Sequence, residues 1–370
     1  MRAPASALIN LLYVVAIGAM LFVPAAGLVI NTAQAPAALT ALLPDSYTPE
    51  SIAALPKALD QHIASSYGTR DEMIRADAAI KAALGGESRR VAFGTDGFLF
   101  LKDDDVFSQV TGQRLDRVRL ARFADMAASL SERYGRDGRR FVVFIAPNKE
   151  TIYRRYLPVW ARTEPAVSER TVLVDLLRAR GVNIVDPTAA LLARAEAEPV
   201  YWRGDTHWTR FGIVIGFDAM VRALGMPEQA IDVDTVFKGQ TAVDRPGDLV
   251  RIAGLGETWP EMAPKPIGAD PFSEEGLVRE KLLPGEKFGG YRLRHGEGAA
   301  RSGPKVLILG DSFTVGGFGP MFMRFVGEFM YLHHGLGAYD RQLVAEFDPD
   351  IVVLAVVERH ITSFREGGKK

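Results

Sequence analysis

The chain has 370 residues, of which 48% are hydrophobic and 24% are charged, a composition typical of globular proteins and not of disordered chains. Its 44 Lys and Arg residues against 45 Asp and Glu residues give a formal net charge of -1, which provides no basic surface for nucleic acid. The absence of cysteine excludes disulfides, thiolate metal sites and cysteine nucleophiles.

The N-terminal region has a long gap in its charges. After Arg2 no charged residue occurs before Asp45, and Leu8 to Ile30 is almost entirely apolar or small. As a helix this segment would extend roughly 34 Å, enough for a bilayer core of about 30 Å and longer than the apolar part of a signal peptide. We therefore expect residues 1–31 to form a membrane anchor. A cleaved signal segment, suggested by Ala33-Gln34-Ala35, and a buried helix are the alternatives.

The position of the positive charges predicts the orientation of this anchor. Arg2 and the amino terminus are the only positive charges near it, so we expect the rest of the chain to face away from the cytoplasm. In a bacterium this means an inner-membrane protein with a periplasmic domain. Residues 32–55, rich in Ala, Pro, Thr and Ser, are expected to be a tether.

Beyond the tether the sequence first predicts a helix and a hairpin. Lys57 to Leu84 is helical in composition and stops at Gly85-Gly86, a common helix end. Arg90 to Leu101 alternates apolar and small residues around Asp96-Gly97, which favours a small β-hairpin.

The remaining sequence alternates between predicted strands and helices. We expect strands at 141–146, 182–185, 306–309 and 351–357, and helices at about 115–134, 168–180, after Pro187, at 210–224 and over 320–347. This alternation predicts the α/β class, with a mostly parallel sheet and helices on both faces. Residues 227–303, rich in Gly, Pro and charge, interrupt it and are expected to be an irregular insertion carrying hairpins. We therefore expect one domain over residues 56–370.

Ser312 is the leading candidate for a nucleophile. It follows a predicted buried strand in the sequence Gly310-Asp311-Ser312, and the carboxyl ends of strands are where open α/β sheets bind ligands. Gly310 allows a tight turn, in which a backbone N–H could stabilise an oxyanion. The alternative interpretation is that Ser312 caps a helix.

His207 is the leading candidate for the base that a serine hydroxyl requires. Asp205 precedes it by two residues. In an extended segment these two side chains project to the same side, so Asp205 could orient the imidazole. The alternative interpretation is a helix N-terminus in which His207 packs against a tryptophan.

Five further residues are candidates for contacts with a substrate or an oxyanion. They are Asn148 and Lys149 after the strand at 141–146, Tyr153 and Trp208 as aromatic surfaces for sugars, and Arg359 after the last strand. A core position is the alternative for the two aromatic residues, and a structural ion pair is the alternative for Arg359. No histidine spacing predicts a metal centre, so we expect neither a metal nor a cofactor.

Two motifs in a fixed order resemble the SGNH hydrolase-like domain of the alginate O-acetyltransferase family (AlgJ/AlgX-like). GDTHW stands at 204–208, and GDSF follows about a hundred residues later at 310–313. GTDGFLFL at 94–101, Pro-x-Lys at 147–149 and Glu358-Arg359 resemble the family too. Ordinary SGNH esterases place the serine motif first, so the inverted order resembles the acetyltransferase branch.

The resemblance, over roughly residues 57–362, implies an SGNH-like fold and a periplasmic enzyme. That enzyme would transfer acetyl groups to hydroxyls of an exported polysaccharide, alginate or another, through an acetyl-serine intermediate. Ser312 would be the nucleophile, His207 the general base and Asp205 its orienting partner. Since acetyl-CoA is absent outside the cytoplasm, the resemblance implies a membrane-bound O-acyltransferase as acetyl donor.

Two other functions are compatible with the same sequence. A polysaccharide acetylesterase would use the same three residues with water as the acceptor. A non-catalytic assembly protein for polysaccharide acetylation would keep the fold and use its groove for binding only.

Overall fold

The computed structural model describes residue 48 and residues 88–284, 289–296 and 301–364. The anchor predicted at 1–31, the helix predicted at 57–84 and the tether at 32–55 lie outside these residues, apart from residue 48. Within the described ranges no helix combines the length and the apolar character that crossing a bilayer requires. The fold described below belongs to the unit Gly85–Lys370.

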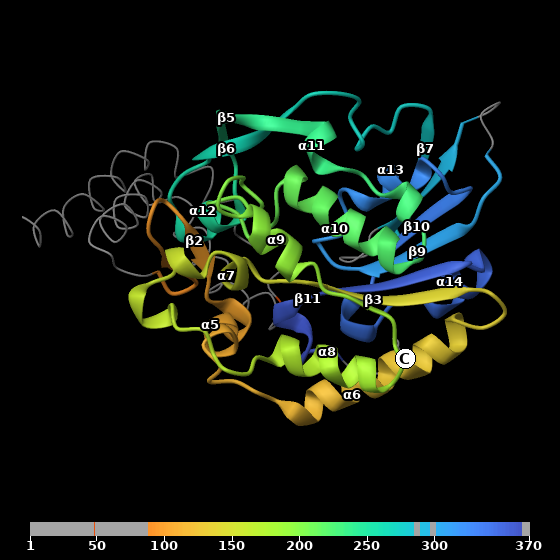
Figure 1. Cartoon of the computed structure of the whole chain (residues 1–370), viewed down its shortest axis with the longest axis horizontal. Coiled ribbons are helices and arrows are strands. Elements are labelled where there is room, and N and C mark those ends of the chain that lie inside the picture. The colour runs from red at the N-terminus through yellow and green to blue at the C-terminus, as the bar shows by residue number, and fades with distance from the viewer. Residues whose placement is uncertain (1–47, 49–87, 285–288, 297–300, 365–370) are drawn as a thin grey trace, which may run out of the picture. The chain divides into compact units, whose positions relative to one another are not determined.

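Seven strands form the central sheet in the order β4-β3-β11-β9-β10-β8-β7 (Figure 1). They are β3 (Arg140–Ala146), β4 (Ile184–Val185), β7 (Leu277–Leu282), β8 (Gly290–His295), β9 (Lys305–Gly310), β10 (Glu328–His333) and β11 (Ile351–Val357). Neighbours from β4 to β10 pair in parallel, whereas β8 pairs antiparallel with both β10 and β7. The sheet is therefore mixed, and the expectation of a mostly parallel sheet is wrong. The antiparallel strands β7 and β8 come from the insertion at 227–303. The prediction of a parallel sheet rested on the alternation of strands and helices outside that insertion.

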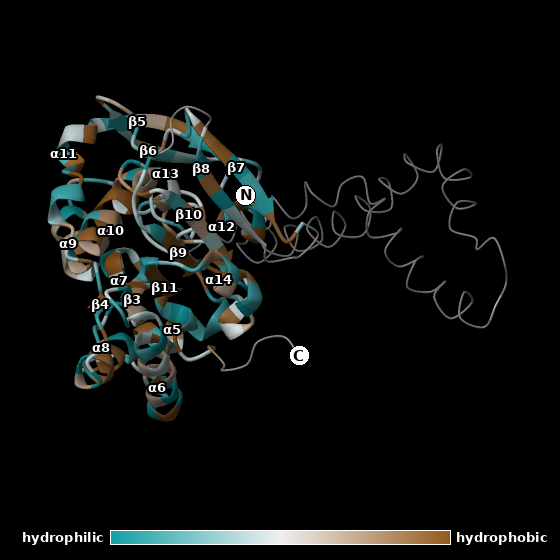
Figure 2. Cartoon of the chain, turned by 90° about the vertical axis from the view of Figure 1, so that its right-hand side faces the viewer, coloured by the Kyte–Doolittle hydropathy of each residue, from teal (hydrophilic) through white to brown (hydrophobic). Residues whose placement is uncertain are grey.

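Helices cover both faces of this sheet. They are α5 (Val106–Val110), α6 (Arg117–Tyr134), α7 (Lys149–Ile152), α8 (Glu169–Ala179), α9 (Thr188–Arg194), α10 (Arg210–Ala223), α11 (Val233–Val236), α12 (Asp248–Ala253), α13 (Phe318–Met323) and α14 (Arg341–Phe347). Val143 on β3 packs in the cluster that contains α6 and α8, and its neighbour Phe144 packs in the cluster with α10 and α13. Because successive strand residues point to opposite faces, an unbroken apolar strand serves two cores at once. In Figure 2 the central strands are largely brown, the colour of hydrophobic residues.

Capping residues define where the main helices begin. The side chain of Asp116 accepts a hydrogen bond from the N–H of Arg119 at the start of α6, and Ser168 and Thr171 form a capping box at α8. Thr209 caps α10 by accepting from the N–H of Gly212. These helices and the strands β3, β9 and β11 lie at the predicted positions.

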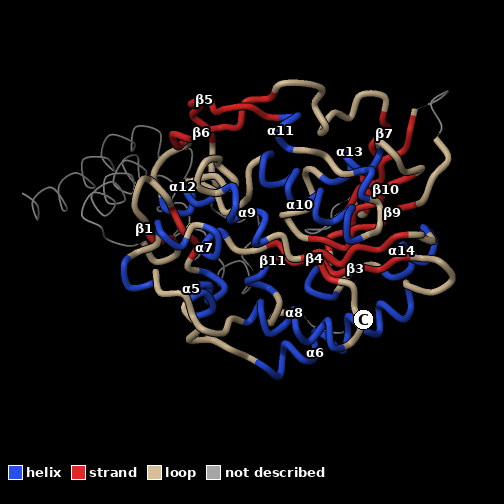
Figure 3. The backbone as a smooth tube through the Cα atoms, in the orientation of Figure 1, coloured by secondary structure: helices blue, strands red, loops and turns tan. Residues whose placement is uncertain are grey.

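The insertion at 227–303 has regular structure. It contains α11 and α12, supplies β7 and β8 to the central sheet, and forms a separate antiparallel pair from β5 (Phe237–Arg245) and β6 (Trp259–Pro266), with α12 between them. We call residues 237–266 the β5–α12–β6 unit. Figure 3 shows its strands apart from the main sheet. The predicted hairpin at 90–101 is confirmed as β1 (Val91–Phe93) and β2 (Leu99–Leu101).

The expectation of helix throughout 320–347 is wrong. Residues 328–333 form the strand β10, which begins directly after Gly327 and ends two residues before Gly335. Its core, Phe329 to Leu332, is a short fully buried apolar run. Periodicity alone cannot distinguish such a run from part of a buried helix.

Candidate active site

The structure brings Ser312, His207 and Asp205 into one hydrogen-bonded chain. Nε2 of His207 lies 2.9 Å from Oγ of Ser312, and Nδ1 lies 2.7 Å from Oδ1 of Asp205. The loop from 203 to 207 is bent and not extended as expected: Oδ1 of Asp205 also accepts the backbone N–H of His207, at 3.0 Å. The bend turns the carboxylate toward the ring, so the two side chains meet by a different backbone path from the one predicted.

The charge of Asp205 determines the proton positions in this chain. Burial alone would raise the pKa of Asp205, but the hydrogen bonds and charge of His207 together with the charge of Arg245 lower it well below the usual range. An ionised carboxylate only accepts hydrogen bonds, so Nδ1 of His207 carries the proton. Nε2 is then free to accept the hydroxyl proton of Ser312.

Ser312 lies exposed in the turn after β9. The carboxylate of Asp311 accepts the backbone N–H groups of Phe313 and Val357, at 3.0 and 2.8 Å. A Cβ on Gly310 would lie 2.0 Å from Oγ1 of Thr314, so the turn requires glycine there. In the part of the chain that the structure describes, the backbone N–H of Ser312 has no acceptor, which leaves it available to a developing oxyanion.

Lys149 and Glu261 hold the loop that carries His207. The ammonium of Lys149 donates to the carbonyl oxygens of Arg203 and Asp205, at 2.7 and 2.9 Å. The carboxylate of Glu261, on β6, accepts the N–H groups of Arg203 and Gly204, at 2.8 and 2.7 Å. Burial lowers the pKa of Lys149 to about 8 and raises the pKa of Glu261. Both side chains thus fix the backbone around the imidazole.

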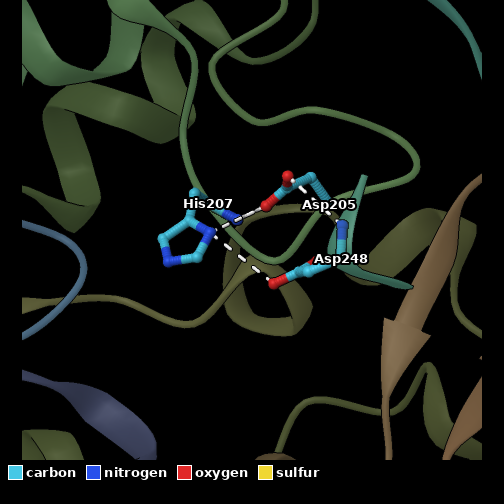
Figure 4. A group of neighbouring side chains, drawn as sticks. All are labelled: Asp205, His207 and Asp248. Atoms are coloured by element: carbon cyan, nitrogen blue, oxygen red, sulfur yellow. Dashed lines mark hydrogen bonds and ion pairs between the residues drawn. The ribbon is translucent and has the colours of Figure 1, made fainter. Parts of the chain in front are cut away.

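Asp248 and Arg245 are site residues that the sequence did not reveal. Oδ2 of Asp248 lies 3.6 Å from Nδ1 of His207, and a guanidinium nitrogen of Arg245 lies 3.5 Å from Oδ2 of Asp205. Both come from the β5–α12–β6 unit, about forty residues beyond the histidine. No short motif links either residue to the histidine, so only the fold brings them to it. Figure 4 shows Asp248 beside His207.

Asp205, His207 and Asp248 also form the one group of three side chains with metal-ligating atoms that the described ranges contain, within 4.8 Å of one another. Their facing atoms already take part in hydrogen bonds: Nδ1 of His207 with Asp205, and Asp248 with Thr206. The arrangement fits proton transfer through an imidazole better than it fits an ion.

Four of the five remaining candidates are structural side chains of the protein interior. Asn148, Lys149, Tyr153 and Trp208 are almost fully buried, and each makes hydrogen bonds within the protein. Asn148 joins the ends of two strands, because its side chain accepts the N–H of Arg359 while its own N–H donates to Glu358. These contacts leave little polar surface of the four residues for a substrate.

Arg359 is placed differently from the other four. Its guanidinium lies 5.2 Å above the ring of Phe313, the residue after the candidate nucleophile. Its Nε lies 3.6 Å from Oδ2 of Asp104 and makes no hydrogen bond to the described residues. Arg359 is therefore the one of the five candidates that combines a position over the residue after Ser312 with a side-chain nitrogen that the described residues leave without a hydrogen bond.

A protein-family model matches a large part of this chain. The family model described as "SGNH hydrolase-like domain, acetyltransferase AlgX" matches residues 91–280, more than half of the chain. The match contains Asp205, His207 and Asp248 and ends before Ser312.

Relatives of this chain include a protein of Pseudomonas aeruginosa named "Probable alginate O-acetylase AlgJ", 26% identical over 249 residues. The alignment covers 64% of this chain and 59% of that relative, so the chain spans less than two thirds of its length.

Solved structures that are similar to this chain include the following two. The O-acetyltransferase domain of Pseudomonas putida AlgJ has a TM-score of 0.46 at 16% identity, covering 75% of this chain and 94% of that one. Bacillus cereus PatB1 has a TM-score of 0.52 at 11% identity, covering 73% and 98%. The likeness to PatB1 shows a common fold. From the extent of the family match, the chain belongs to the family of SGNH hydrolase-like domains of the acetyltransferase AlgX.

Proposed function

We propose that this chain is a serine-dependent O-acetyltransferase that acts on hydroxyl groups of an exported polysaccharide such as alginate. The observation that carries the proposal is the hydrogen-bonded chain from Ser312 through His207 to Asp205. Hydroxyl, imidazole and carboxylate in this order are the constellation used for acyl transfer on several unrelated folds. The name of the Pseudomonas aeruginosa relative, "Probable alginate O-acetylase AlgJ", supports the choice of acetyl and of a polysaccharide.

The proposed reaction has two half-reactions at Ser312. In the first, Oγ attacks the acetyl carbonyl of the donor and His207 accepts the hydroxyl proton at Nε2. The carbonyl oxygen becomes an oxyanion that the N–H of Ser312 stabilises. Collapse breaks the bond to the donor group, which leaves with the proton from His207 and leaves acetyl on Ser312.

The second half-reaction returns the serine. A sugar hydroxyl gives its proton to Nε2 of His207 as its oxygen attacks the acetyl carbon. The sugar ester leaves, and Oγ of Ser312 takes the proton back. Water would complete the same steps as a hydrolysis, and the exposed position of Ser312 keeps this acetylesterase reaction as the second candidate.

The test is acetyl transfer by the purified full chain, with a chromogenic acetyl ester as donor and alginate oligosaccharides as acceptor. We expect acetylated sugar and a transient acetyl group on the peptide that contains Ser312. Ser312→Ala should lower the transfer rate by about a thousandfold or more. Ser129→Ala, an exposed serine on α6, is the matched control and should keep the wild-type rate.

Two results would contradict the proposal. Release of acetate with no acetylated sugar under any donor would indicate the acetylesterase. Full acetylation of the polymer in cells that carry Ser312→Ala would indicate the non-catalytic assembly protein.

We also propose that the catalytic domain lies in the periplasm and receives acetyl from a membrane-bound O-acyltransferase. The apolar, uncharged sequence from Leu8 to Ile30 and the positive charges before it support this location. A C-terminal alkaline phosphatase fusion should be active, because that reporter needs an oxidising compartment, and a β-galactosidase fusion should be inactive. The opposite pair of results would place the domain in the cytoplasm. Deleting the acyltransferase should abolish polymer acetylation without lowering the amount of this chain, and continued acetylation would exclude that donor.

A further inference from the structure

A second carboxylate lies beside the imidazole of His207. Oδ1 of Asp248 accepts the backbone N–H of Thr206 at 2.8 Å, and Oδ2 accepts the Thr206 hydroxyl at 2.5 Å. The same Oδ2 lies 3.6 Å from Nδ1 of His207. The hydroxyl oxygen of Thr206 lies 3.3 Å from that ring nitrogen. Two carboxylates, Asp205 and Asp248, therefore face one ring nitrogen (Figure 4).

The fold places Asp248 there through close backbone packing. Asp248 is the first residue of α12, directly after Gly247. A Cβ on Gly247 would lie 2.2 Å from the carbonyl oxygen of Gly204, so this approach requires glycine. The same carbonyl accepts the N–H of Val250, at 3.3 Å. The start of α12 thus rests on the loop that carries His207, and Asp248 has little freedom to move away.

The charges around His207 explain what a second carboxylate adds. Asp205 makes the direct hydrogen bond, but its other oxygen faces Arg245 and also accepts the N–H of Asp248, at 3.5 and 3.4 Å. The ammonium of Lys149 donates a hydrogen bond to the backbone carbonyl oxygen of Asp205. Positive groups therefore offset part of the negative charge of Asp205. When Ser312 loses its proton the ring becomes positively charged, and Asp248 supplies a further negative charge a few ångströms away.

We propose that Asp248 is a positioning residue of the reaction: through Thr206 it holds His207 against Ser312, and its charge stabilises the imidazolium that forms. This inference rests on the proposed roles of Ser312 and His207. It assigns to the β5–α12–β6 unit a part in the chemistry and not only in the architecture.

The test measures how fast an aryl sulfonyl fluoride labels Ser312 of the full chain as pH is varied. In that reaction Oγ attacks sulfur, fluoride leaves, and the hydroxyl proton passes to His207 and then to solvent. Intact-mass spectrometry follows the label, and no acetyl donor or sugar is needed. A nearby anion favours the protonated form of an imidazole. Removing the charge of Asp248 should therefore let the imidazole of His207 stay neutral, and able to accept a proton, at lower pH.

For Asp248→Asn we expect labelling at neutral pH to slow by about tenfold and the acid limb of the profile to move down by about half a pH unit or more. Thr206→Val, which keeps the charge and removes the hydroxyl, should slow labelling without moving the limb. Asp248→Glu, which also keeps the charge, should leave the limb in place. Asp244→Asn removes an exposed carboxylate of β5 and should change neither quantity.

Wild-type rate and profile in Asp248→Asn would overturn the proposal. A slower rate with an unmoved acid limb would overturn the charge contribution and leave a structural role only. If Asp248→Asn does not fold, Asp248→Glu decides, because a limb moved to lower pH in that variant contradicts the proposal. Labelling that persists in Ser312→Ala would instead count against the proposed function.

Discussion

The ammonium group of Lys149 donates hydrogen bonds to two carbonyl oxygens of the His207 loop and lies 5.3 Å from the ring centre of Phe100. The side chain is 2% exposed, so its charge is held away from water. Burial is the main reason that the pKa of Lys149 falls to about 8. Lys149 thus holds the His207 loop in place, but burying its charge lowers the free energy of unfolding by an amount that depends on pH.

Lys149→Met should remove that pH dependence. With a pKa of 10.5 in the unfolded chain and about 8 in the folded one, Lys149 binds more proton when unfolded between these values. The free energy of unfolding therefore gains a contribution that rises with pH across this window, on the order of 3 kcal/mol in total. Urea unfolding at pH 8 and pH 10 should show the rise in the wild type and a smaller one in Lys149→Met.

The control for this prediction is Lys238→Met, which removes an exposed lysine of β5. It should keep the wild-type difference between the two pH values. Equal pH dependence in Lys149→Met and the wild type would mean that the ammonium is not buried as the structure has it.

At the scale of elements, the parts of the site that the sequence predicted are those encoded locally. Asp205 and His207 are two residues apart, and Ser312 follows a buried strand in a glycine turn. Asp248 and Glu261 could not be found in this way, because they reach the loop only through the packing of the β5–α12–β6 unit. Their spacing from His207 carries no periodic signal.

The errors in the predicted fold have the same origin. The strands β7 and β8 lie in a stretch rich in glycine, proline and charge, and four of the six residues of β7 are exposed. Such strands lack the unbroken apolar pattern that identified β3, β9 and β11. Their place in the sheet depends on β10, the strand mistaken for helix. One missed strand therefore hid the antiparallel part of the sheet.

Across the described domain, burial differs sharply between the sheet and the unit that completes the site. All seven residues of β11 are buried, whereas most of β5 is exposed. Local opening of the backbone is easiest where little apolar surface is buried. The site therefore combines a serine turn on the most buried sheet with a histidine loop held by a more exposed unit.

Glu261→Gln should loosen that unit without affecting the sheet. The carboxylate of Glu261 accepts the N–H groups of Arg203 and Gly204 on separate oxygens. An amide has one accepting oxygen, so one buried N–H loses its partner, at a local cost of about 1–3 kcal/mol. Hydrogen exchange of peptides covering 203–206 should then speed up by roughly tenfold or more, while exchange in β11 stays at the wild-type rate. Glu257→Gln, an exposed residue just before β6, should leave both regions unchanged. Faster exchange throughout the sheet would show that the His207 loop and the sheet open as one cooperative unit. That result would contradict the inference, made from burial, that the β5–α12–β6 unit opens more easily than the sheet.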